Sequence, residues 1–142
     1  MDDLLRLLPH GYPMRLVDRV VSVRPGIELE AVSVISAREP CYAAGIGPYP
    51  AVLLLEALIQ TAALLWLADL EADGPAEVLL AAVRGARFGA AAQPGDVVRH
   101  QAVLRSATAR RAILAGRTDL AQQRGGVPAL EVREIVLARR AT

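Results

Sequence analysis

The chain has 142 residues, of which 54% are hydrophobic, and its formal net charge is +1. This length suits one domain with a single core, and the apolar fraction excludes a disordered chain. The nearly neutral charge gives no sign of a nucleic-acid or membrane-surface partner, and the single cysteine excludes an internal disulfide and favours a reducing, cytoplasmic location.

The first part of the chain predicts a short helix and a pair of strands. Residues 1–8 form the expected helix, which a proline and a glycine end, and they are too few and too acidic for a signal peptide. Alternating apolar residues at 17–23 and 27–36, with a turn between them, predict two paired strands. A loop rich in glycine and proline follows at 38–49.

A long apolar segment at 50–72 predicts a helix, which opens on a proline, as first turns tolerate, and stops before a Gly-Pro pair. The segment is long enough to cross a bilayer. It contains Glu56 and Gln60, however, and a carboxylate in mid-bilayer is costly, while no Lys/Arg cluster flanks the segment. We therefore expect a helix buried in protein and no contact with a membrane.

Four further strand-like runs follow the helix, at 77–88, 97–107, 110–120 and 129–138. No linker, repeat or low-complexity segment divides the chain, so we expect one domain over residues 1–142. A lone apolar helix among strands has to be covered by the sheet on all sides. The pattern thus predicts an α+β hotdog fold, an antiparallel sheet of about five to six strands wrapped around one long central helix. We expect its open edge to pair with a second subunit.

Five short motifs occur in order along the chain. They are L-P-H-G-Y-P with L-V-D-R-V in residues 8–20, Glu39-Pro40, P-A-V-L-L-L-E-A followed by Gln60 in residues 50–60, A-R-F at 86–88 and P-G-D at 94–96. Each motif is weak alone, but the ordered series resembles that of the 3-hydroxyacyl-acyl carrier protein dehydratase family. The resemblance implies the hotdog fold, a place in fatty acid or polyketide biosynthesis, and an acyl carrier protein carrying a 3-hydroxyacyl chain as partner.

One loop departs from the family's pattern, which places a histidine in F-x-G-H-F-P-G-x-P-x-M-P-G as the catalytic base. The loop at 41–50 reads C-Y-A-A-G-I-G-P-Y-P and is shorter, so the position of the histidine falls at Gly45 or, with a slip of one residue, at Ile46. Neither residue can take a proton. The glycine that follows the helix-opening proline in the family is Ala51 here. The chain therefore lacks the family's base.

Dehydration of a 3-hydroxyacyl thioester needs a base, an acid and hydrogen-bond donors for the thioester oxygen. Free N–H groups at the start of the long helix, where Ala51 lies, can supply the donors. Glu56 stands alone in an apolar run, where burial would favour its protonated form, as a general acid requires. Gln60 follows one turn later and can orient it. The alternative is a relic carboxylate that is merely solvated in a cavity.

The remaining candidates are weaker. His10 is expected to be structural, because the family pattern holds a histidine there beside its base. His100 is expected to be exposed and not catalytic, and Cys41 to be a small buried residue rather than a nucleophile. No metal-ligand spacing or nucleotide-binding glycine motif occurs, so we expect no metal and no cofactor. Substrate contacts are expected at Gly45, Ile46, Tyr49, Ala51 and Gln60.

Three interpretations of the function stay open. The first is one half of a heterodimeric dehydratase, in which Glu56 completes a site with the histidine of a partner homologue. The second is a non-catalytic homodimer that binds acyl thioesters or acyl carrier protein. The third is a hotdog thioesterase, in which a helix carboxylate activates water without a histidine. The dehydratase-type motifs favour the first over the third, and the isolated chain is expected to be inactive.

Overall fold

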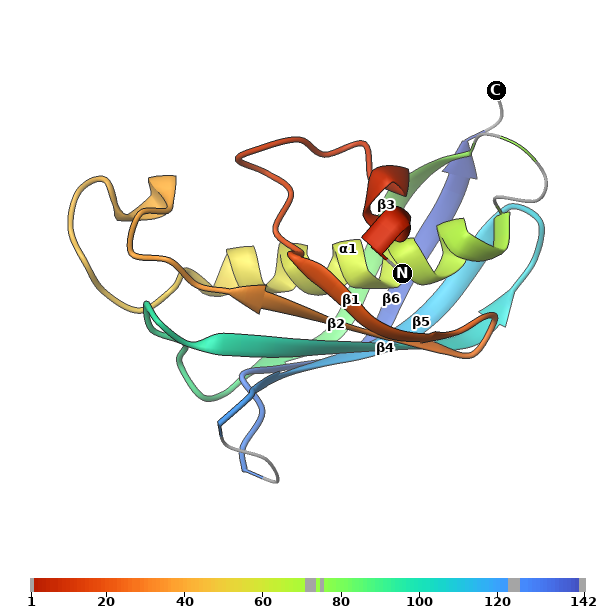
Figure 1. The fold of residues 1–142 in the computed structure, drawn as a ribbon. Helices are drawn as coiled ribbons and strands as arrows, with labels where there is room; N and C mark the ends of the chain where they lie inside the picture. Colours follow the sequence, from red (N-terminus) through yellow and green to blue (C-terminus); the bar gives the residue numbers. More distant parts are fainter. Residues whose placement is uncertain (1, 71–73, 75, 123–125, 141–142) are drawn as a thin grey trace.

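The computed structural model describes residues 2–70, 74, 76–122 and 126–140. In it, a six-stranded antiparallel sheet curves around one long helix, which confirms the predicted hotdog fold (Figure 1). The elements in chain order are η1 (Asp2–Leu7), β1 (Arg19–Arg24), β2 (Glu28–Val34), η2 (Pro40–Tyr42), α1 (Ala51–Leu70), β3 (Glu77–Phe88), β4 (Val97–Ala107), β5 (Arg111–Leu120) and β6 (Leu130–Arg140).

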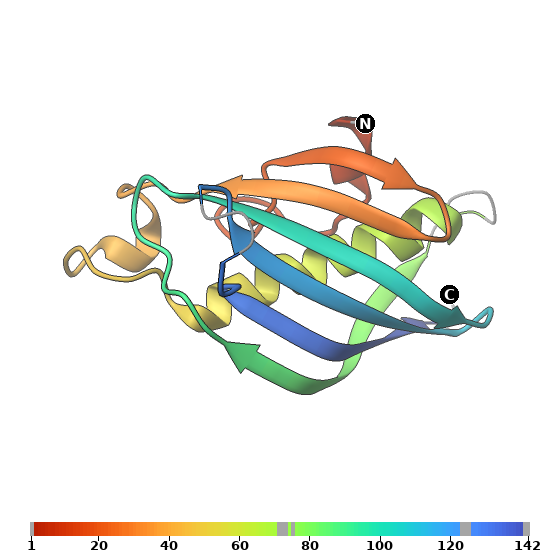
Figure 2. The ribbon, with the colours of Figure 1, turned by 90° about the horizontal axis from the view of Figure 1, so that it is seen from below.

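The sheet has the strand order β1-β2-β4-β5-β6-β3, so β1 and β3 form its two edges (Figure 2). The long strand β3 pairs with β6 along its whole length, from Glu77 opposite Arg140 to Phe88 opposite Leu130. On its other side β3 has no partner strand among the described residues. Such an edge exposes a row of unpaired backbone groups. It is therefore available to a strand of a second subunit.

Helix α1 lies on the concave side of the sheet and is apolar all round, as buried helices are (Figure 1). By length and composition it could cross a membrane, but here it is the core helix, and Leu58, Leu64 and Leu65 are fully buried. Gly116 on β5 permits the close approach of helix and sheet, because a Cβ atom there would lie 2.9 Å from a methyl group of Leu58. A larger residue at this position would push α1 away from the sheet.

The boundaries of the elements differ slightly from the predicted ones. Helix α1 begins at Ala51 and is described as far as Leu70, while the last predicted positions, 71 and 72, lie outside the described residues. Strand β1 begins at Arg19, later than predicted. Strand β6 continues to Arg140, past its predicted end, because its last residues pair with the start of β3.

Two predictions about burial are wrong. His100 is fully buried, because β4 turns residues 98, 100 and 102 toward the interior. Its ring atoms have partners there in Ser33 and Thr118, as buried polar groups require. Cys41 is exposed, because it belongs to η2 in the loop before α1, outside the wrapped sheet.

Candidate functional site

The carboxylate of Glu56 meets two polar side chains of its own chain. Its Oε1 atom accepts a hydrogen bond from Gln60 Nε2 at 3.0 Å and lies 3.3 Å from His10 Nε2. The side chains of His10 and Glu56 are 33% and 30% exposed, so the carboxylate is partly open to solvent in the single subunit. Glu56 is therefore not enclosed by apolar side chains alone, as the sequence had suggested, because the segment before β1 brings His10 over the helix.

Gln60 is 1% exposed and joins α1 to the segment before β1. Its Oε1 atom accepts the N–H of Leu16 at 2.9 Å, and its Nε2 atom donates to the carbonyl oxygen of Met14 at 2.7 Å and to Glu56. A backbone N–H only donates and a carbonyl oxygen only accepts, so these two partners fix which end of the amide carries the oxygen. The amide therefore presents an N–H group to Glu56.

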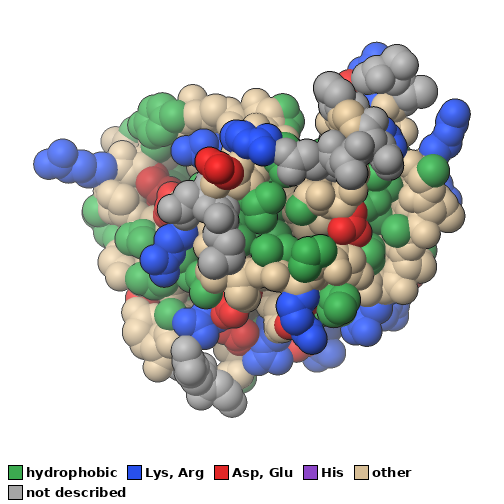
Figure 3. All heavy atoms as spheres, turned by 45° about the vertical axis from the view of Figure 1, so that its right-hand side comes forward, with side chains coloured by type: hydrophobic (Ala, Val, Ile, Leu, Met, Phe, Trp, Pro, Cys, Tyr) green, Lys and Arg blue, Asp and Glu red, His purple; other side chains and the backbone are tan. Residues whose placement is uncertain are grey.

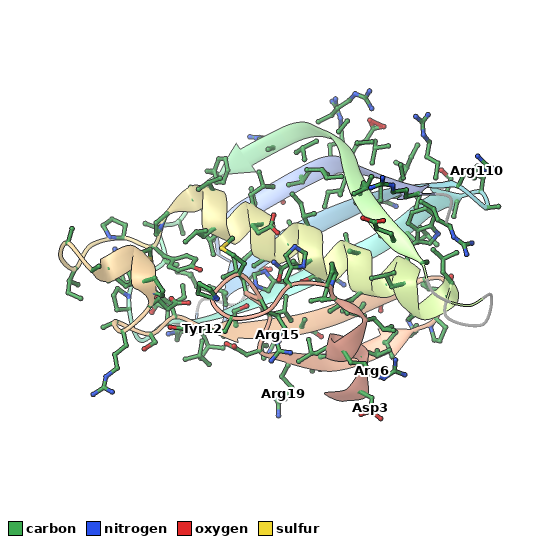
Figure 4. All side chains as sticks on the ribbon, turned by 90° about the horizontal axis from the view of Figure 1, so that it is seen from above. Asp3, Arg6, Tyr12, Arg15, Arg19 and Arg110 are labelled. Carbon is green, nitrogen blue, oxygen red and sulfur yellow. The ribbon has the colours of Figure 1, made fainter. Side chains whose placement is uncertain are left out.

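The segment that carries His10 passes over α1 before the chain enters β1 (Figure 1). In Figure 4, Tyr12 and Arg15 mark this crossing, and Tyr12 is 88% exposed. The second ring nitrogen of His10, Nδ1, is buried and has no hydrogen-bond partner within the described ranges. Buried polar atoms are nearly always paired. His10 therefore keeps one unused hydrogen-bonding position beside Glu56.

A cavity of about 300 Å³ lies between the segment before β1, the loop around η2 and the first turn of α1. Its volume is at the lower end of the range typical of small-molecule sites. Most of its walls are apolar, and the polar side chains among them come from the loop before α1. The cavity is lined by Pro13, Met14, Leu16, Glu39, Pro40, Cys41, Tyr49 and Leu53.

The altered loop contributes only some of the expected substrate contacts to this cavity. Tyr49 lines it, and burial raises the pKa of its hydroxyl group, which stays protonated and able to donate a hydrogen bond. Gly45 and the 68% exposed Ile46 do not line it in the single subunit. Ala51 is exposed at the helix start, and the N–H groups of Ala51 and Val52 have no hydrogen-bond partner in the described part of the chain.

Glu39 is a candidate that the sequence marked only as part of a motif. Its side chain lines the cavity, and its Oε2 atom is buried without a hydrogen-bond partner among residues 2–70, 74, 76–122 and 126–140. Burial and, to a smaller degree, the charge of Asp18 raise the pKa of this carboxyl group, while a hydrogen bond from the backbone of Ser36 acts in the opposite direction. In the sequence, the position of Glu39 directly before the altered loop is the signal that marks it as a candidate site residue.

A second hollow, of about 460 Å³, lies on the outer face of the sheet. Arg87, Arg105, Arg117 and Arg133 line it together with Glu131. Because alternate residues of the same strands face α1, the sheet separates this hollow from Glu56. On the face that Figure 3 shows, basic, acidic and hydrophobic side chains are interspersed. The inner cavity and the cluster around Glu56 are therefore the candidate site.

The single long helix inside a curved antiparallel sheet identifies the chain as a hotdog-fold protein, and its polar cluster and cavity lie on and beside this helix. Solved structures of the same fold include the dehydratase heterocomplex ApeI:P from Xenorhabdus doucetiae, with a TM-score of 0.79, 16% identity, and coverage of 98% of this chain and 91% of that chain. A putative thioesterase from Ralstonia eutropha matches with a TM-score of 0.65 at 20% identity, over 84% and 83% of the two chains. These likenesses establish the fold.

The chain belongs to the FabA-like domain family, which matches residues 8–127. The 3-hydroxyacyl-[acyl-carrier-protein] dehydratase FabZ of Chloroflexus aggregans is 42% identical over 103 residues, 70% of this chain and 70% of that protein. The FabZ dehydratase of Polynucleobacter necessarius is 40% identical over 99 residues, 68% of this chain and 66% of that protein. The family resemblance inferred from the ordered motifs is thus confirmed.

Proposed function

We propose that this chain is a cytoplasmic dehydratase subunit of fatty acid or polyketide biosynthesis, which supplies Glu56 to a site shared with a histidine-bearing partner subunit. The FabZ relatives, dehydratases of 3-hydroxyacyl chains on acyl carrier protein, support the reaction and the substrate class. The observation that carries the proposal is the arrangement around Glu56. Gln60 donates to the carboxylate and His10 lies 3.3 Å from it, and Glu56 follows one turn after Leu53, which lines the cavity. Glu56 itself does not line the cavity in the single subunit, and the loop position of the family's base holds Gly45 or Ile46.

In the proposed reaction, the partner's histidine removes a proton from the carbon next to the thioester carbonyl. Glu56, in its acid form, gives its proton to the departing hydroxyl group, and the C–O bond breaks as the C=C bond forms. The products are water and the unsaturated thioester, and the two groups exchange protons with solvent afterwards. Charge that develops on the thioester oxygen is stabilised by the free N–H groups of Ala51 and Val52 at the helix start.

Three observations support the proposed need for a second subunit. Within it, the cavity near Glu56 offers carboxyl, phenol and thiol groups but no histidine from the loop. The open edge of β3, with Leu79, Leu80 and Phe88 about half exposed, suits strand pairing with another subunit. A dehydratase heterocomplex with this fold, ApeI:P, is a precedent for two chains in one dehydratase. These points favour a pair over a self-sufficient subunit.

The two alternatives are weaker. The two thioesterase-like structures from Ralstonia eutropha and Streptococcus pneumoniae share the fold with this chain at 20% and 6% identity, whereas the FabZ dehydratase of Chloroflexus aggregans is 42% identical. A non-catalytic homodimer that binds acyl thioesters remains the competing hypothesis, because it also explains a missing base. It predicts no effect of Glu56 on any partner's turnover.

The decisive experiment is co-expression with a homologue that keeps the G-H-F-P loop. The two chains are purified by a tag on one of them, and dehydration of a 3-hydroxyacyl chain on acyl carrier protein is followed. We expect a stable complex whose activity depends on both Glu56 and the partner's loop histidine. Failure of the two chains to co-purify, or full activity of the partner without this chain, contradicts the proposal.

A further inference from the structure

Leu16 is held at both of its backbone polar groups by side chains from different layers of the fold. Its N–H donates to Gln60 Oε1 of α1 at 2.9 Å, and its carbonyl oxygen accepts from Ser33 Oγ of β2 at 2.5 Å. Gln60 in turn donates to Glu56. A displacement of Leu16 is therefore transmitted to the group that holds the carboxylate.

The contact at Ser33 continues into a buried polar row that crosses three strands. Ser33 Oγ lies 2.9 Å from His100 Nε2, and His100 Nδ1 lies 2.8 Å from Thr118 Oγ1. His100 of β4 is directly opposite Thr118 of β5 in the strand register. Ser33, His100 and Thr118 are 7%, 0% and 0% exposed, so no water competes freely for these atoms. The side chains of such a buried row are held strongly in place, because the removal of any one polar group leaves its buried neighbour without a hydrogen-bond partner.

The direction of every hydrogen bond in this row can be assigned. The hydroxyl of Ser33 has one proton, and a carbonyl oxygen can only accept, so this proton points to Leu16. Ser33 Oγ must then accept the N–H of His100 Nε2. Burial lowers the pKa of His100 to about 4, so its ring is neutral near pH 7, and Nδ1 accepts the proton of the Thr118 hydroxyl. The row is therefore a single donor chain that starts at Thr118 and ends at Leu16.

We propose that His100 is a positioning residue for Glu56, acting through Ser33, Leu16 and Gln60. The imidazole N–H holds the hydroxyl of Ser33, which anchors Leu16, and Leu16 fixes the amide of Gln60 that donates to the carboxylate. The inference rests on the proposed function, because it assumes that Glu56 takes part in proton transfer. The buried face of the sheet, and not only α1, then sets the orientation of this carboxyl group.

The first test needs neither activity nor a partner. In the ¹⁵N-labelled full chain, the side-chain amide signals of Gln60 report its hydrogen bonds. His100→Leu removes the donor to Ser33 while keeping an apolar side chain in the core, and His100→Gln retains an N–H at the reach of Nε2. We expect the Gln60 signals to shift and to exchange faster with solvent in His100→Leu, and to remain close to wild type in His100→Gln. Gln101→Ala, on the exposed face of the same strand, is the matched control and should change nothing.

The second test is turnover in the reconstituted pair. Misplacement of a catalytic group by about 1 Å can cost about 10²-fold in rate, so we expect His100→Leu to lower kcat by about tenfold or more, with KM nearly unchanged, and His100→Gln to recover most of it. Where His100→Leu does not fold, Ser33→Ala breaks the same connection and takes its place. Unchanged Gln60 signals in a folded His100→Leu or Ser33→Ala chain would overturn the positioning role. An inactive wild-type pair would instead overturn the proposed function.

Discussion

His10 and Glu56 face each other between the first loop and α1, with His10 Nε2 at 3.3 Å from Glu56 Oε1. Gln60 donates to the same oxygen. Within the described residues, the other carboxylate oxygen, Oε2, makes no hydrogen bond, so the two oxygens differ in role. Oε1 is the atom by which the chain orients the carboxyl group, and in the proposed reaction Oε2 is the atom that gives its proton to the substrate.

His10→Gln should therefore have a modest effect on turnover. Gln60 still holds Oε1 in this variant, so we expect the reconstituted pair to lose less than about tenfold, below the range of about 10²–10⁴ typical of an acid–base group. The measurement is kcat of the pair with wild-type and His10→Gln chains. A loss as large as that caused by removing the carboxylate itself would identify His10 as a base that this chain supplies.

The isolated chain should have negligible dehydratase activity. Its loop offers Gly45 and Ile46 where the family has a base, and the absence of one acid–base group lowers the rate by about 10²–10⁴-fold. The purified chain is incubated with a 3-hydroxyacyl chain on acyl carrier protein, with an intact FabZ enzyme as the positive control. Turnover at the rate of that control would show that the chain carries a base of its own, with Glu39 and His10 as the first residues to replace.

The sequence predicted the fold well, because its signals are local and repeated. Alternation in the strands, the lone apolar helix and the ordered motifs each indicate the same wrapped sheet. The spacing on the helix predicted the contact of Gln60 with Glu56, which the structure shows at 3.0 Å. The contact of His10 could not be predicted, because His10 comes from a distant segment and only the tertiary fold brings it to the helix. The burial of His100 could not be predicted either, because it too depends on contacts between segments that are distant in sequence. A histidine on an alternating strand is ambiguous in sequence, and its burial depends on Ser33 and Thr118 in two neighbouring strands.

The chain should form a homodimer, or a heterodimer with its partner, through the edge of β3. Leu80 is 48% exposed on this edge strand, so a lysine there should weaken the association by placing a charge in the contact. Ile27, 49% exposed in the turn between β1 and β2, provides the matched control. We expect Leu80→Lys, but not Ile27→Lys, to shift the chain toward monomer in size-exclusion chromatography. A wild-type chain that is monomeric at micromolar concentration contradicts this assembly.

Stability should fall as the pH drops below about 6.5, the usual pKa of an unfolded histidine. Burial lowers the pKa of His100 in the folded chain to about 4, so between these values the unfolded chain binds a proton that the folded chain does not. The free energy of unfolding should decrease by about 1.4 kcal/mol per pH unit in this window from this group. Urea unfolding at pH 7 and pH 5 measures the change, and it should be smaller in His100→Gln. Equal pH dependence in both chains would contradict a buried neutral imidazole.

Glu56→Gln separates a catalytic subunit from a scaffold. The amide keeps the size of the carboxylate, and its oxygen can still accept from Gln60, but it has no proton to deliver. If Glu56 is the acid of a shared site, the reconstituted pair should lose about 10²-fold or more in turnover. The assembly should stay intact, because Glu56 contributes only a partly exposed carboxylate to the fold.

The control for this substitution is Glu134→Gln, which neutralises a carboxylate of similar exposure, 34% against 30%, on a residue that pairs with Arg84 and not with the site. It should leave both assembly and turnover near wild type, since exposed ion pairs contribute about 0–1 kcal/mol. Dehydration rates of the three pairs are compared after size-exclusion chromatography has verified each complex. Equal rates for Glu56→Gln and wild type, in intact complexes, would remove Glu56 from the chemistry. The chain would then be a non-catalytic scaffold in the complex, since the proposal of a shared site depends on this carboxylate above every other residue.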